Sequence, residues 1–299
     1  MAKGLYQRSV KYIKNMIGGS NNKKVINFVR LQGQIDSGTS PKSLNLNHVN
    51  QSLKNAFNID GDGVNPTAVC LLINSPGGSP VQSNLISNQI RKLSKKTKIP
   101  VYAFAEDVAA SGGYMLLSAA DECYANQFSI IGSIGVISFG FGLKDKNILY
   151  DQLGIEPRIQ TAGDNKFRNN PFEPWKEEDK IHKKYLLTKL HEIFVNVTQL
   201  YRNGKLPADE NKIKQVFSGD VFNAEDSKKL GLIDGIGDME AIMEEKYGEV
   251  EFNKIVKKAS FFEKILLDGP FGGFSSSSSH LSLSAGLDNI LNSNKHRFF

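Results

Sequence analysis

The chain has 299 residues, of which 40% are hydrophobic and 23% are charged, and its net charge is +6. This is ordinary globular composition, and the chain is long enough to bury one sizeable core. The lysines are scattered, and we expect no nucleic-acid partner. Two cysteines are too few for a disulfide framework, and no apolar run approaches the ~20 residues of a membrane span.

The N-terminal extension, residues 1–23, carries Lys3, Arg8, Lys11 and Lys14 but no acidic residue. Its apolar residues could share one helical face, as in a mitochondrial targeting peptide or a basic helix on a membrane surface. A solvated tail explains the same residues, and the three interpretations stay open. We expect an intracellular protein without a transmembrane segment. The extension suggests a mitochondrial location and is where peripheral membrane contact would occur.

Apolar runs typical of strands alternate with segments of helical periodicity. The runs expected as strands are 24–35, 68–74, 101–106 and 122–126. The segments expected as helices are 48–59, 81–93, the second half of 107–121, 147–155 and 176–201, followed by short helices within 224–234 and 239–248 around a Gly-Leu-Ile-Asp strand. This alternation indicates an α/β fold with a largely parallel sheet.

Two further stretches mark the limits of this domain. The turn at 60–63 reads Asp-Gly-Asp-Gly, but the ligands that a calcium loop needs downstream are absent, so we expect no metal and no cofactor. The Ser-rich tail, residues 259–299, is low in complexity and is expected to be mobile. The folded domain is therefore expected over 24–258.

Ser111 lies between small residues in Ala-Ala-Ser-Gly-Gly-Tyr, directly after a strand and at the start of an apolar helix. A turn at this place exposes a hydroxyl, and the helix start offers free amides and partial positive charge to a developing oxyanion. A serine among small residues is also a common helix N-cap. The motif alone leaves both interpretations open.

A second glycine turn, Asn74–Pro80, also ends a strand and precedes a helix. Its two glycines can turn backbone amides outward at no steric cost. An amide from this turn and that of Gly112 could form an oxyanion hole with two donors, although a tight strand-to-helix turn explains the same residues.

The residue that would activate Ser111 is not obvious from local pattern. None of the five histidines lies beside a glycine turn, and we interpret them as surface or packing residues. A lysine can act as the base when burial disfavours its charged form. Lys166 follows a strand-like segment and precedes a proline-containing loop, but the chain has many lysines.

Five segments, taken together, resemble the signal peptide peptidase A (protease IV) family of Ser–Lys peptidases in its short form with a single core. The resemblance spans roughly 24–248, most of the chain, and five segments in order are strongly specific. The fold of that family implies a crotonase and Clp-protease-like α/β superfold with repeated ββα units and a largely parallel sheet. The segments are LLINSPGGS, VYAFAEDVAASGGYMLLSAAD, CYANQFSIIGSIGVI, LGIEPRIQTAGDNKFRNNPF and AEDSKKLGLIDGIG.

The resemblance implies a role for each matching position. Ser111 is the expected nucleophile and Lys166 the expected general base. Ser133 is expected to orient the lysine, and Gly78 and Gly112 to donate to the oxyanion. The implied function is a serine endopeptidase that acts on peptides or unfolded proteins through an acyl-enzyme. Self-association into a homo-oligomer is also expected.

The chain departs from the family pattern in two ways. Bacterial members carry an N-terminal membrane anchor, which is not expected here, and Phe167 and Arg168 replace the usual residues after the base. A Clp-type Ser–His–Asp peptidase is disfavoured, because no histidine follows Ser111 at the required distance. A crotonase-like acyl-CoA enzyme and a catalytically inactive scaffold with the same fold stay open as alternatives.

Overall fold

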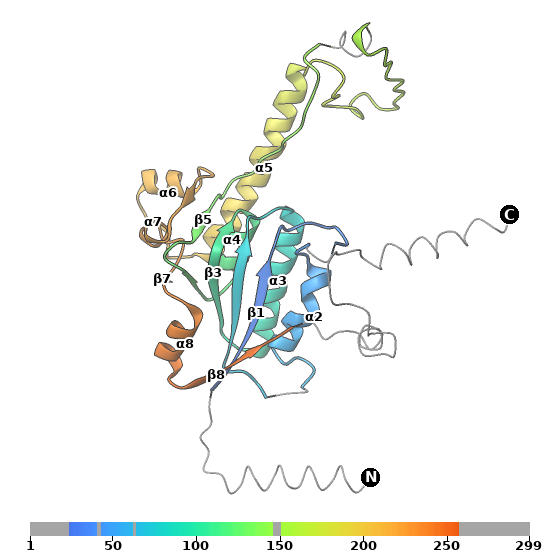
Figure 1. Cartoon of the computed structure of the whole chain (residues 1–299). Helices are drawn as coiled ribbons and strands as arrows, with labels where there is room; N and C mark the ends of the chain where they lie inside the picture. The colour runs from blue at the N-terminus through green and yellow to red at the C-terminus, as the bar shows by residue number, and fades with distance from the viewer. Residues whose placement is uncertain (1–23, 41–42, 62–63, 146–150, 257–299) are drawn as a thin grey trace, which may run out of the picture. The chain divides into compact units, whose positions relative to one another are not determined.

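The computed structural model describes residues 24–40, 43–61, 64–145 and 151–256 (Figure 1). The basic extension 1–23 and the Ser-rich tail 259–299 lie outside these residues, as does the start of the predicted helix 147–155. The described residues include no helix that is both long and apolar enough to cross a membrane.

The strands of the described chain form one sheet with the order β6-β5-β3-β2-β1-β8, and off this path β4 pairs with β3 and β7 pairs with β4. All pairings are parallel except that of β5 with β6. The strands are β1 (Lys24–Gln32), β2 (Ala68–Ser75), β3 (Val101–Ala110), β4 (Glu122–Ala125), β5 (Ile130–Gly132), β6 (Val221–Phe222), β7 (Gly235–Ile236) and β8 (Val250–Lys254).

Helices cover both faces of the sheet, with α2, α3 and α4 on one face and α8 on the other (Figure 1). The last part of α5 joins the larger layer through Phe194 and Val197. The helices are α2 (Leu46–Ala56), α3 (Pro80–Thr97), α4 (Gly112–Ser118), α5 (Glu177–Tyr201), α6 (Glu210–Val216), α7 (Ala224–Lys229) and α8 (Met239–Tyr247).

The alternation of side chains along β2 explains the two cores. Val69, Leu71 and Ile73 point into the larger core, whereas Ala68 and Cys70 point into the smaller core beneath α8. Because both faces are covered, β2 reads as a continuous apolar run rather than an alternating one. Burial of each large aliphatic side chain in these cores stabilises the fold by about 1.5–3 kcal/mol.

Strand β3 pairs with two different strands along its length, and this change of partner determines where the site lies. Its first half pairs with β4, from Tyr102 opposite Glu122 onward, and its last three residues pair with β5. Ala110 therefore lies opposite Gly132, and both strands end at the same edge of the sheet. The residues that follow these two strands are Ser111 and Ser133.

Several elements differ from the sequence-based expectation. The Gly-Leu-Ile-Asp stretch is a buried turn rather than a strand, since Gly231 has a φ of +70° and the strand β7 begins only at Gly235. Helix α6 and the strands β5, β6 and β8 were not predicted. Strand β8 lies at the sheet edge and pairs with the distant β1, a contact that no local pattern can show.

Candidate active site

Ser111 occupies a strained turn between β3 and α4. Its φ of 52° and ψ of −121° lie where non-glycine residues are rare, and such a conformation costs of order 1–3 kcal/mol. The helix that follows is buried along its whole length. Ser111 occupies the N-cap position of α4, but its side chain makes no capping hydrogen bond to the helix. Backbone strain of this kind is often kept at functional sites, where the surrounding structure enforces it.

The turn at Gly77 and Gly78 packs directly against Ser111. A Cβ on Gly77 would lie 2.8 Å from Ser111 Cβ and 2.7 Å from the amide nitrogen of Gly112. A Cβ on Gly78 would lie 2.0 Å from the Ile35 carbonyl oxygen, so only glycine fits. Glycine at both positions is therefore a requirement of close backbone approach.

Some backbone groups of this turn pair with neighbouring backbone, whereas the amide of Gly78 does not take part in that pairing. The Ile35 amide donates to the Gly77 carbonyl at 2.8 Å, and the Ser79 amide donates to the Ile35 carbonyl at 2.7 Å. This pairing does not use the amide of Gly78. Gly112 is the first residue of α4, so its amide has no intrahelical acceptor. Both amides belong to backbone that lies beside Ser111, as an oxyanion hole requires.

Ser75 holds the glycine turn and the start of α4 in place. Its buried hydroxyl accepts the Gly77 amide at 3.2 Å and donates to the Gly33 carbonyl at 2.7 Å. Its carbonyl oxygen would lie 2.3 Å from a Cβ on Gly113, so α4 starts directly against it. Ser75 thus contacts both the glycine turn and the helix start, and nothing in its sequence context predicted this.

Ser133 lies on the neighbouring strand end. The Ser111 amide donates to the Gly132 carbonyl at 2.8 Å, and the Ser133 amide donates to the Asp220 carbonyl at 2.6 Å. Ser133 is also held at a positive φ, 51°. The structure therefore brings Ser111, Ser133 and the two proposed oxyanion glycines to one edge of the sheet.

Lys166 is not at this edge. It is exposed, in the loop before α5, and Figure 1 shows this loop at the end of α5 that is remote from the sheet. Among the described residues the structure shows no contact between Lys166 and either serine. In this conformation of one chain, four of the five expected site residues come together and the proposed base does not.

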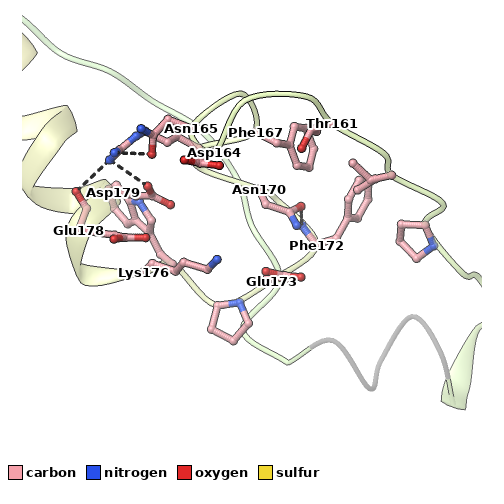
Figure 2. A pocket seen from close by; sticks show the side chains of 15 residues that line it. Thr161, Asp164, Asn165, Phe167, Asn170, Phe172, Glu173, Lys176, Glu178 and Asp179 are labelled. Carbon is pink, nitrogen blue, oxygen red and sulfur yellow. Dashed lines mark hydrogen bonds and ion pairs between the residues drawn. The ribbon is translucent and has the colours of Figure 1, made fainter.

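The loop that carries Lys166 is nevertheless built around a pocket of about 340 Å³ (Figure 2). Arg168, which departs from the family pattern, bridges this loop to the first turn of α5. Its guanidinium contacts Asp179 at 3.3 Å and donates to Asn165 at 2.6 Å. The indole of Trp175 donates to Asn169 at 3.0 Å. Lys166 is thus presented by a loop whose flanks are anchored.

A buried polar network fixes α4 and the end of α5 to each other. The Tyr114 hydroxyl donates to the Leu232 carbonyl at 3.0 Å, and burial raises the Tyr114 pKa. Arg202 contacts Asp234 at 2.7 Å, and Lys205 contacts it at 2.8 Å. Burial alone would raise the pKa of Asp234, but these hydrogen bonds hold it below its usual value. The Tyr and Asp of the two family-like motifs are therefore structural anchors.

The site region includes His191, which the sequence analysis interpreted only as a surface or packing residue. His191 Nε2 lies 3.0 Å from the carbonyl oxygen of Ile134, the residue after Ser133. The sequence held one signal, because His191 precedes the buried Phe194 and Thr198 by three and seven residues and so shares their helix face. It gave no means of knowing which turn that face would meet.

Known proteins share sequence and fold with this chain. The profile of Peptidase family S49 matches residues 93–253. A Brucella abortus protein named Na(+)/H(+) antiporter NhaA is 42% identical over 234 residues, which are 78% of this chain and 30% of that protein. An Arabidopsis thaliana protein, Serine protease SPPA, chloroplastic, is 34% identical over 57% of this chain and 24% of its own length. The chain therefore spans less than a third of either relative.

Among solved structures, a mutant of the 1510-N membrane-bound stomatin-specific protease superposes with a TM-score of 0.50 and 14% identity. The match covers 79% of this chain and 99% of that one. At this identity the match speaks for the fold alone, and it confirms the expected α/β fold with a largely parallel sheet. The sequence matches confirm the expected family, and the chain belongs to peptidase family S49, a family of serine-type peptidases.

Proposed function

We propose that the chain is a serine endopeptidase in which Ser111 is the nucleophile and Lys166 is the general base. The observation that carries the proposal is the position of Ser111. It lies on a strained turn, against the Gly77–Gly78 turn and the start of α4, and its side chain makes no capping hydrogen bond to the helix. Peptide or unfolded-protein chains are the proposed substrates.

In the proposed reaction, neutral Lys166 takes the hydroxyl proton as Ser111 Oγ forms a bond to the substrate carbonyl carbon. The carbonyl oxygen becomes an oxyanion that accepts hydrogen bonds from the amides of Gly78 and Gly112. Lys166 then gives its proton to the leaving amine as the peptide bond breaks. Water attacks the acyl-enzyme by the reverse sequence and restores Ser111.

An ammonium group cannot accept a proton, so Lys166 must lose exposure when it meets Ser111, because burial disfavours the charged form. We propose that a second copy of the chain supplies this closure. The support is an apolar stripe on α5 with Leu186, Leu190 and Ile193 at 43–58% exposure, on the helix that follows the Lys166 loop. Apolar surface of this kind favours association.

Two sets of variants test these proposals. Purified wild type should hydrolyse a labelled unfolded protein, and Ser111→Ala should fold but show no turnover. Ser111→Ala and Lys166→Ala should each be inactive alone and regain activity when mixed, since one copy would then hold Ser111 and its neighbour Lys166. Recovery on mixing requires a shared site. Activity in wild type without recovery on mixing would place both residues in one copy, and turnover by Ser111→Ala would exclude the nucleophile.

One observation favours a second function, a scaffold of the same fold without catalysis. Lys166 is exposed and makes no contact with Ser111 in the described chain. Wild type that folds, self-associates and still fails to hydrolyse any unfolded protein or react at Ser111 would support this second function.

A further inference from the structure

We propose that His191 is a positioning residue for the reaction at Ser111, acting through the turn that presents Ser133. This inference rests on the proposed function. His191 touches neither the nucleophile nor the proposed base, and its importance follows from what it holds in place.

The contact itself has a defined polarity. His191 Nε2 lies 3.0 Å from the Ile134 carbonyl oxygen, and a carbonyl can only accept a hydrogen bond. Nε2 must therefore carry the proton, whether the ring is neutral or charged. His191 is partly buried, on the helix face of Phe194 and Thr198 that packs on the core.

The Ser133 turn is held from several directions, and His191 makes the side-chain link among them in the described chain. Since Ser133 has a φ of 51°, the turn keeps its shape only if its surroundings enforce it. Backbone hydrogen bonds supply the other restraints: Ser111 N to Gly132 O at 2.8 Å, Ser133 N to Asp220 O at 2.6 Å and Gly135 N to Ser133 O at 2.9 Å.

The contact between His191 and Ile134 also holds α5, the helix that follows the loop of Lys166. After the turn, the chain runs beside α5 toward the loop of Lys166, where the Leu143 amide donates to the Pro171 carbonyl at 2.7 Å (Figure 1). The buried positions of α5 that pack on the core, Phe194 and Thr198, follow His191. The arm consists of α5, the segment that runs beside it and the Lys166 loop. His191 is thus a polar contact where this arm leaves the core, and it couples the direction of α5 to the Ser133 turn.

Loss of this contact should misplace Ser133 and the arm relative to Ser111 while leaving the glycine turn untouched. A displacement of about 1 Å can lower a rate by roughly 100-fold. We therefore expect His191→Phe, which keeps the ring but has no N–H, to lower kcat by roughly 10- to 100-fold with KM little changed. His191→Gln can present a donor near the position of Nε2 and should restore most of the activity.

The test measures kcat and KM with a fluorogenic peptide, the rate of labelling by a fluorophosphonate, and the unfolding midpoint. His191→Asn serves as a second variant without the bond, because its amide is too short to reach Ile134, in case His191→Phe does not fold. His182→Phe and His182→Gln are matched controls, since His182 is an exposed histidine on the same helix. Both controls should match wild type.

The outcomes separate the two proposals. Active wild type, a reduced kcat in His191→Phe or His191→Asn and recovery in His191→Gln support the positioning role. Active wild type with unchanged kcat in both variants overturns it and leaves the proposed function standing. A loss that Gln does not rescue and that tracks a lower unfolding midpoint shows a structural role only, which also overturns it. Wild type that does not react at Ser111 refutes the proposed function and this inference together.

Discussion

The main-chain amide of Ser111 donates a hydrogen bond of 2.8 Å to the carbonyl oxygen of Gly132. This bond extends the β3–β5 pairing by one residue and fixes the Ser111 turn beside the turn of Ser133. Both serines have a φ near 50°, so two strained residues lie at the ends of adjacent strands. Strain of this kind persists where the surroundings over-determine it, as they do in functional sites.

Replacement of Gly78 by alanine should abolish turnover. Its Cβ would lie 2.0 Å from the Ile35 carbonyl oxygen, so the turn must move and carry the proposed oxyanion amide with it. Kinetics and urea unfolding of Gly78→Ala measure both effects.

Gly61→Ala is the matched control, since Gly61 also has a positive φ but a Cβ there meets nothing within 4 Å. It should cost about 1–2 kcal/mol of stability and leave turnover intact. Normal kcat in Gly78→Ala would remove this turn from the oxyanion hole.

Ser75→Ala should lower both stability and kcat. It leaves the Gly77 amide and the Gly33 carbonyl without the hydroxyl that serves both, and an unsatisfied buried group costs about 1–3 kcal/mol. The freed Gly77 amide should also loosen the turn beside Ser111. Denaturant unfolding and steady-state kinetics report the two effects. Ser118→Ala, which removes a buried serine hydroxyl bonded within its own helix, should leave kcat unchanged. Equal kcat in both variants would show that Ser75 has no part in positioning the turn.

Asp234→Asn should be the most destabilising of these variants, because Arg202 is only 1% exposed and would lose its carboxylate. Removal of one partner of a buried pair costs about 3–5 kcal/mol. The folded pKa of Asp234 lies below its unfolded value, so its contribution is complete above about pH 4 and is lost as the pH falls through the folded pKa. The wild type should therefore lose part of its advantage over the variant in acid. A constant stability difference down to about pH 2 would contradict the lowered pKa.

Lys166→Arg should be inactive although its charge is kept, because a guanidinium does not lose its proton near neutral pH. Loss of a general base lowers kcat by roughly 10²- to 10⁴-fold. The control is Lys176→Arg, since Lys176 lines the pocket beside the loop that carries Lys166 (Figure 2). Steady-state turnover of both variants decides the matter. Full activity of Lys166→Arg would return the search for a base to the histidines.

Sequence reasoning succeeded where a strand end, a glycine turn and a helix start are adjacent in the chain. Such local patterns singled out Ser111, the Asn74–Pro80 turn and Gly112, and the family resemblance added Gly78, Ser133 and Lys166. It failed for contacts made between distant segments, such as His191 with Ile134 or β8 with β1. Ser75 was missed because its partners, Gly33 and Gly77, become neighbours only when β1 and β2 pair.

In the proposed function, Ser111 is a nucleophile activated by Lys166. The most direct measurement incubates wild type and Lys166→Ala with a fluorophosphonate and maps the adduct by mass spectrometry, with Ser111→Ala as the blank. We predict an adduct on Ser111 in wild type, little or none in Lys166→Ala and none in the blank. An adduct on another serine, or equal labelling of Ser111 with and without Lys166, would contradict the claim.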